Sequence, residues 1–138
     1  MSENITQSKK VEAFSKGIDY STYRSLIKSL LTENKTTGSN HSEAMIAYTK
    51  MNDQRMSRWD KKINLDSELS KAISELPKMN WMVITEAWCG DAAQNIPFIA
   101  KLASENPKID LRFIMRDEHP EVMDEYLKGK EKPLTKNE

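Results

Sequence analysis

Two short apolar runs enclose a helical stretch in the second half of the chain. The runs Trp81–Thr85 and Ile109–Met115 are rich in β-favouring residues, and residues 91–105 repeat apolar side chains at helical spacing. A strand, a helix and a second strand in this order predict a right-handed crossover that joins two parallel strands. Parallel strands of this kind are covered on both faces. Other segments of the chain must therefore pack against this pair.

Upstream of the strands, apolar side chains recur at three- and four-residue steps, which is typical of helices that bury one face. Asn52 is a polar interruption of one such stripe, and Asp66 is placed to cap the N-terminus of another helix. The pattern predicts a helix that starts at residue 20 and ends within 32–38, a second from Asn40 or Ser42 to residue 63, and a third over 66–76. A short last helix is predicted to start at Pro120 and reach residue 127.

The chain is predicted to form one folding unit, residues 19–138, preceded by a loose polar N-terminal arm, residues 1–18. The unit comprises a helical section (19–77), a β-α-β-α core (78–128) and a polar tail (129–138). The core alone is shorter than the roughly 60 residues at which independent domains become marginal. The helical section is therefore expected to pack on the sheet.

Composition excludes several classes of function. Lys plus Arg equals Asp plus Glu at 21 each, so no net charge attracts nucleic acid or an anionic membrane. No apolar stretch approaches the roughly 18–20 residues that span a bilayer, and residues 1–10 contain no apolar signal core. The single cysteine cannot form an internal disulfide. We expect a cytoplasmic protein that binds neither nucleic acid nor membranes.

The single cysteine, Cys89, lies where the first predicted strand gives way to a helix. Backbone N–H groups at a helix start lack partners, and their dipole favours the thiolate, the reactive form of cysteine. Gly90 leaves room for a partner's backbone near the sulfur. Asp91 suits a helix start but repels a thiolate. Trp88 is expected to cover the helix start, with contact to a partner as the alternative.

The string Trp88-Cys89-Gly90 after an apolar strand, with Pro97 eight residues beyond the cysteine, resembles the active-site strand and kinked first helix of the thioredoxin superfamily. The resemblance implies an α/β, thioredoxin-like fold. Three stretches are also similar to a group of bacterial thioredoxin-like proteins with a helical N-terminal section: Asn52–Arg58, Val83–Gln94 and Arg116–Glu118.

The chain departs from the thioredoxin pattern at three places. Ala92 occupies the position of the second, resolving cysteine, and Val83 that of the buried acid. Only Pro133 could stand near the place of the family's cis-proline, and too few residues follow it for two more strands. The resemblance thus implies a fold truncated after the first β-α-β-α. An uncovered strand edge would favour a homodimer.

Two functions from different classes remain open. In the first, Cys89 attacks a disulfide and forms a mixed disulfide, which an external thiol resolves without a cofactor. The expected partners are a disulfide-bearing protein or a low-molecular-weight thiol. In the second, the chain is a non-catalytic interaction module or a remnant, as Ala92 and Val83 suggest. A redox sensor, in which a small thiol caps Cys89, is a further alternative.

Metal chemistry has little support in the sequence. His41, His119 and Cys89 show no short-range ligand spacing, so no metal site is expected. Cys89-Gly90 also begins the motif of cluster-binding monothiol glutaredoxins, but Asp91 and Ala92 do not continue it.

Other side chains are assigned structural roles. Glu86 is expected to be a solvated residue at the strand end, and Trp59 and Trp81 core or interface anchors. The methionines Met45, Met51 and Met56 are expected to fill the core rather than line a groove. On the same helix, four basic residues are expected to form a solvated face ion-paired with Asp53 and Asp60, with an anion site as the alternative: Arg55, Arg58, Lys61 and Lys62.

Overall fold

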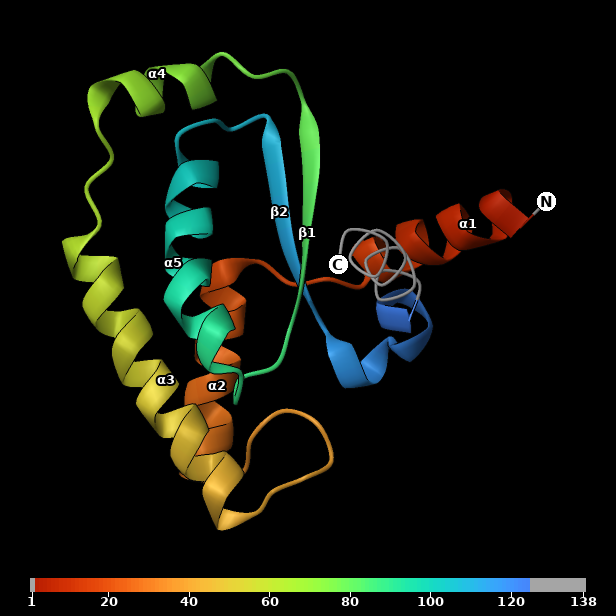
Figure 1. Ribbon diagram of the computed structural model, residues 1–138, viewed down its shortest axis with the longest axis vertical. Coiled ribbons are helices and arrows are strands. Elements are labelled where there is room, and N and C mark those ends of the chain that lie inside the picture. Colours follow the sequence, from red (N-terminus) through yellow and green to blue (C-terminus); the bar gives the residue numbers. More distant parts are fainter. Residues whose placement is uncertain (1, 125–138) are drawn as a thin grey trace, which may run out of the picture.

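The computed structural model describes residues 2–124, in which two parallel strands form the sheet. Strand β1 (Met79–Thr85) pairs with β2 (Ile109–Met115) along its whole length, with Met79 opposite Ile109 and Thr85 opposite Met115. Helix α5 (Gly90–Ser104) connects the strands (Figure 1). The predicted strand, helix, strand unit is confirmed, with β1 starting two residues before the apolar run.

Three of the helices that precede the sheet lie close to the predicted ranges. They are α2 (Tyr20–Thr32), α3 (Glu43–Lys62) and α4 (Ser67–Ser74). Each begins after a residue whose side chain accepts a hydrogen bond from a backbone N–H of the first turn, which satisfies one of the unpaired donors there. These N-capping residues are Asp19, Ser42 and Asp66.

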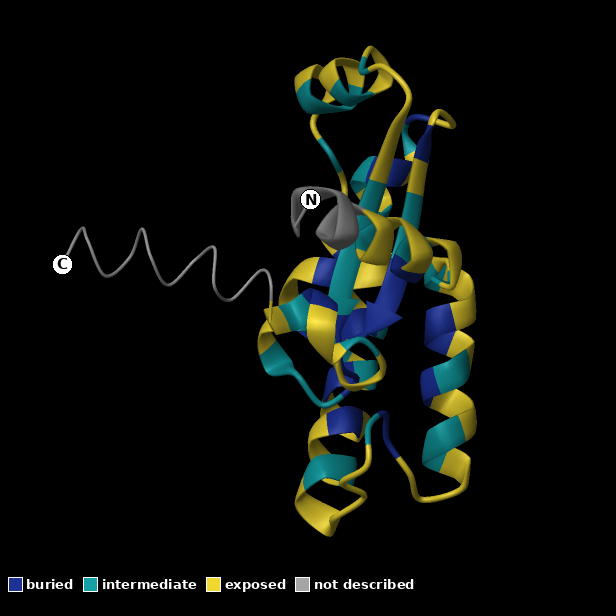
Figure 2. Cartoon of the chain, turned by 90° about the vertical axis from the view of Figure 1, so that its right-hand side faces the viewer, coloured by how far each residue is buried: buried dark blue, intermediate teal, exposed yellow. Residues whose placement is uncertain are grey.

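The sheet carries one apolar cluster on each face, because successive side chains of a strand point to opposite sides. Figure 1 shows α2, α3 and α5 on one side of the strands and α1 with residues 116–124 on the other. Phe113 and Met115 join the larger cluster, whereas Ile114 joins the smaller one. The Tyr23 ring of α2 stacks on Phe113, with ring centroids 5.2 Å apart. Figure 2 shows the buried residues gathered on the strands and on the helix faces turned toward them.

The N-terminal segment differs from the loose arm predicted for residues 1–18. It contains helix α1 (Ser2–Ser15), whose Ala13 is buried against Ile114 and Val122. Beyond the helix, Ile18 and Phe113 exchange two backbone hydrogen bonds of 3.0 and 2.7 Å, which form an antiparallel bridge at the edge of β2. The backbone groups at the edge of β2 thus supply hydrogen-bond partners that this polar segment does not have by itself.

The predicted last helix begins at Pro120 and is helical through residue 124. The rest of that helix and the tail 129–138, including Pro133, lie outside the described residues. Among the helices of the described part, none has both the length and the apolar character needed to cross a bilayer.

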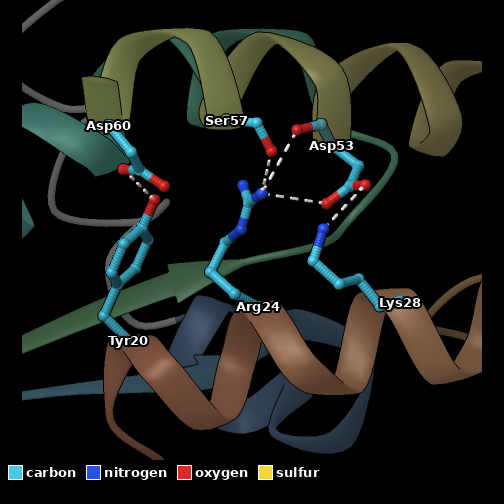
Figure 3. Close-up of polar contacts among 6 residues, drawn as sticks. All are labelled: Tyr20, Arg24, Lys28, Asp53, Ser57 and Asp60. Carbon is cyan, nitrogen blue, oxygen red and sulfur yellow. Dashed lines mark hydrogen bonds and ion pairs between the residues drawn. The ribbon is translucent and has the colours of Figure 1, made fainter. Parts of the chain in front are cut away.

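Helices α2 and α3 are joined by polar contacts (Figure 3). The buried Arg24 side chain of α2 reaches the Asp53 carboxylate at 3.1 Å and donates to Ser57 Oγ at 2.7 Å. Lys28 lies 3.5 Å from the same carboxylate, and the Tyr20 hydroxyl donates to Asp60 at 2.7 Å.

These contacts correct the predicted charge pairing on α3. The carboxylates Asp53 and Asp60 face α2 instead of pairing with the basic residues of their own helix. Within residues 2–124, Arg55 makes no hydrogen bond or ion pair. The contacts with α2 therefore orient α3 and leave the cation of Arg55 available to other groups.

Replacing the N-cap Asp19 by alanine is expected to cost about 1 kcal/mol of unfolding free energy at pH 7. Its carboxylate accepts the Thr22 N–H at 2.8 Å, and this hydrogen bond lowers the pKa of Asp19. A lowered folded pKa stabilises the protein above the unfolded value of about 3.9, and that contribution is lost as the pH falls through the folded pKa. Urea unfolding at pH 7 and pH 3 should show the cost of Asp19→Ala shrinking in acid. Asp19→Asn, which keeps a capping oxygen, should cost less than Asp19→Ala at pH 7, and equal losses would contradict this prediction.

Candidate functional site

Cys89 is the N-cap residue of α5. Its backbone is extended (φ −80°, ψ 116°), its N–H donates to the Glu86 carbonyl at 3.0 Å, and its carbonyl accepts the Ala93 N–H at 3.2 Å. The thiol is free and partly buried, and it makes no capping hydrogen bond to the first turn of α5. The sulfur thus lies at the positive end of a helix whose first amides are not occupied by the cysteine itself.

A cleft of about 530 Å³ opens beside Cys89. Helix α3 forms one wall, and the turn after β1 together with the first residues of α5 forms the other. Tyr48 is 51% exposed and Met51 40% exposed, so apolar surface is available to a ligand. The lining residues are Met45, Tyr48, Met51, Asn52 and Arg55 of α3, Trp88 and Cys89 of the turn, and Gly90 and Asp91 at the start of α5.

The turn that carries Cys89 is held from both sides at Ala87. The Ala87 N–H donates to the Thr37 hydroxyl at 2.9 Å, and the Ala87 carbonyl accepts from the Asn52 amide at 3.0 Å. All three residues are buried. Since buried backbone groups are costly to leave unpaired, Thr37 and Asn52 determine where Trp88 and Cys89 lie.

Glu86, three residues before Cys89, is buried with only 2% of its surface exposed. One carboxyl oxygen accepts from the Thr37 hydroxyl and the other from the Asp117 N–H at 2.9 Å. Burial raises the pKa of Glu86, although these two hydrogen bonds oppose the shift. The predicted solvated role of Glu86 is therefore wrong: two distant segments enclose the carboxyl group.

Gly38 allows one of these segments to approach Glu86. Its φ of +83° lies in the left-handed region that L side chains rarely adopt. A Cβ at this position would also lie 2.5 Å from Asp117 Oδ2. Only glycine fits between the Thr37 loop and the segment of Asp117.

Tyr23 of α2 reaches the end of β1, just before the turn that carries Cys89. Its hydroxyl is 3.4 Å from Thr85 Oγ1. Burial raises the pKa of Tyr23 to about 12, with the charges of Glu86 and Cys89 acting in the same direction. Tyr23 is therefore a neutral phenol at physiological pH.

The geometry of metal binding is not met by side chains in the described part of the chain. Across residues 2–124, no three His, Cys, Asp or Glu side chains gather closely enough to hold an ion. His41 uses Nδ1 to accept the Thr36 N–H at 3.2 Å, within the loop before α3.

Comparison with known proteins adds a decisive observation. The family model described as thioredoxin matches residues 38–134, which is more than half of the chain. The chain belongs to the thioredoxin family. The match includes α3, the turn with Cys89, and all of the residues that line the cleft, whereas α1 and α2 precede it. No curated protein and no solved structure matched in the other two comparisons.

In this thioredoxin-family chain, four of the five residues singled out from the sequence meet at one site. Trp88, Cys89, Gly90 and Asp91 all line the cleft. Pro97 lies inside α5 as predicted and is buried, but it lines a separate cavity beside Tyr20 and Asp60.

The α3 wall of the thioredoxin-family cleft was missed by the sequence interpretation. Met56 is a core residue, as predicted, but Met45 and Met51 line the cleft. Trp59 is not a buried anchor: it is 42% exposed, and its indole N–H donates to Gln94 at 2.9 Å. In the sequence, Asn52 was the residue that pointed to this wall, because a polar side chain on an apolar helix face needs a buried hydrogen-bond partner.

Proposed function

We propose that this thioredoxin-family protein is a thiol–disulfide oxidoreductase that acts through Cys89 alone. The observation that supports the proposal is the position of the sulfur: it lies at the N-terminus of α5, in a cleft whose α3 wall exposes apolar surface. The thiolate is the form of cysteine that attacks a disulfide, and the cleft provides space for a second sulfur and its substituents.

The proposed reaction has two steps. The Cys89 thiolate attacks a substrate disulfide, so that a new S–S bond forms at Cys89 and the other substrate sulfur leaves as a thiolate. The thiolate of an external low-molecular-weight thiol then attacks this mixed disulfide, takes the bound substrate sulfur into a new disulfide, and releases Cys89 as a thiolate. The external thiol supplies the electrons, because Ala92 stands where a resolving cysteine would be needed.

Glu86 does not take over the role of the family's buried acid, whose position is occupied by Val83. Val83, at the position of the family's buried acid, packs against the core, and the buried carboxyl group in this structure belongs to Glu86. Glu86 is engaged by Thr37 and Asp117, so we assign it to holding the turn rather than to proton transfer from Cys89.

Replacement of Cys89 by serine is expected to abolish mixed-disulfide formation and the glutathione-dependent reduction of insulin. Intact mass spectrometry after incubation with oxidised glutathione should show one glutathione adduct on the wild type and none on Cys89→Ser. As a gain-of-function control, Ala92→Cys places a second thiol one helical turn from the first and should release the bound glutathione without added thiol.

The alternative function is a non-catalytic thioredoxin-fold interaction module, favoured by Ala92 and Val83. It predicts a wild type that forms no adduct and reduces no insulin, which would contradict the oxidoreductase. An adduct that forms but never turns over with excess glutathione would instead indicate a redox sensor.

A further inference from the structure

Arg55 is the cation beside Cys89 in the cleft. It projects from α3, is partly buried, and lines the cleft together with Cys89 and Gly90. Its Nη1 lies 3.9 Å from the position that a Cβ on Gly90 would occupy, so the guanidinium reaches the first residue of α5. In the described part of the chain its charge has no hydrogen-bonding or ion-pairing partner.

The surroundings of Arg55 explain why its charge has no ion-pairing partner in the described part of the chain. The acidic residue nearest to it in sequence, Asp53, is engaged by Arg24 and Lys28 of α2. Asp91 lines the same cleft but makes no ion pair with Arg55. A guanidinium presents several N–H donors in a plane, a geometry that matches a carboxylate.

We propose that Arg55 is a specificity-determining residue that binds a carboxylate located a few atoms from the disulfide sulfur of the substrate. This inference rests on the proposed reaction at Cys89 and names its substrate class. The remaining walls, Tyr48, Met51 and Trp88, contact the apolar atoms between the carboxylate and the sulfur. The carboxylate belongs either to a small acidic thiol or to an acidic residue beside a protein disulfide.

The first experiment compares alkylation of Cys89 by iodoacetate and by iodoacetamide, which differ mainly in the carboxylate. The ratio of the two rates is independent of how much thiolate is present, because both reagents attack the same thiolate. At low salt, Arg55→Gln is expected to lower the iodoacetate to iodoacetamide ratio about two- to five-fold, as for a partly exposed ion pair. High salt should remove the difference.

Arg58→Gln is the matched control. Arg58 lies on the same helix, is exposed, and does not line the cleft, so its replacement removes the same charge without touching the site. It should leave the ratio within experimental error of the wild type. An Arg55→Gln variant whose ratio is unchanged, or falls no further than in Arg58→Gln, overturns the proposal. An equal slowing by both reagents also overturns it, because it would show that Arg55 acts only on the thiolate.

The second experiment separates the two sources of the carboxylate. The rate of mixed-disulfide formation is compared within two pairs of substrates. The first pair consists of small disulfides, 3,3′-dithiodipropionate with carboxylates and bis(2-hydroxyethyl) disulfide without them. The second pair consists of cystine peptides in which the cystine is flanked either by Glu or by Gln. If Arg55→Gln loses the preference for the carboxylate-bearing member only among the small disulfides, the substrate is an acidic thiol. If it loses this preference only among the peptides, the substrate is a protein. If Arg55→Gln keeps the wild-type preference for the carboxylate in both pairs, the proposal is overturned. If no disulfide reacts with the wild type, the proposed function fails, while the alkylation ratio still decides the role of Arg55.

Discussion

Glu86→Ala is expected to lower the free energy of unfolding by about 2–4 kcal/mol, a large part of the roughly 5–15 kcal/mol that stabilises a typical domain. The substitution removes the acceptor for the Thr37 hydroxyl and for the Asp117 N–H, and it leaves a cavity at a site that is 2% exposed. Urea denaturation followed by circular dichroism measures the loss.

Glu86→Gln is the matched variant and should behave differently. Its carbonyl can accept the Asp117 N–H, and its amide can donate to Thr37 Oγ1. Both contacts are then kept without a charge, with the direction of the Thr37 hydrogen bond reversed. Because burial raises the pKa of Glu86, its folded pKa lies above the unfolded value of about 4.3. The stability that protonated Glu86 contributes is therefore complete below that value and is lost as the pH rises through the folded pKa.

The stability of Glu86→Gln relative to the wild type should thus increase from pH 4 to pH 8, because glutamine does not titrate. Unfolding free energies at several pH values across this range measure the difference. A difference that stays constant with pH would show that Glu86 keeps an ordinary pKa in the folded state. A loss in Glu86→Gln as large as in Glu86→Ala would show that the network does not tolerate an amide.

Asn52→Ala is expected to destabilise the protein by about 1–3 kcal/mol and to slow the reaction of Cys89 with disulfides about ten-fold. The Asn52 amide is the partner of the buried Ala87 carbonyl, two residues before Cys89. Without it, the turn can relax away from α3, and Trp88 and Cys89 move with it. Stopped-flow measurement of mixed-disulfide formation, beside urea denaturation, separates displacement of the cysteine from loss of stability.

Gln54→Ala is the control for Asn52→Ala, since it removes a side-chain amide from an exposed position of the same helix. It should change neither the stability nor the reaction rate appreciably. A destabilised Asn52→Ala variant that reacts at the wild-type rate, under conditions where both proteins are folded, would limit Asn52 to a purely structural role.

Much of the fold could be predicted because its causes are local. The spacing of apolar residues in 81–115 specifies strand, helix and strand, and Asp66 caps α4 through the N–H of Leu69, three residues ahead. Cys89 likewise follows an apolar strand directly and precedes a helix. Each of these features depends on residues within a few positions along the chain.

The environment of Glu86 could not be predicted in this way. Its two partners, Thr37 and Asp117, are 49 and 31 residues away in sequence, and nothing beside Glu86 distinguishes a buried carboxyl from a solvated one. Met45 and Met51 were misassigned for a related reason. Residue type alone does not distinguish them from the core residue Met56, and only the packing of α3 decides which of its side chains lie over the core and which over the cleft.

The amino-acid sequence by itself determined that Cys89 stands at the start of a helix, because secondary structure at this place follows from apolar periodicity and near neighbours. Tertiary structure alone decided what surrounds the sulfur. Helix α2 engages Asp53 and Asp60, α3 is thereby oriented across α5, and Arg55 and Asn52 are brought to the turn. Such contacts join segments far apart in the chain, so they are set by the packing of whole elements rather than by any local pattern.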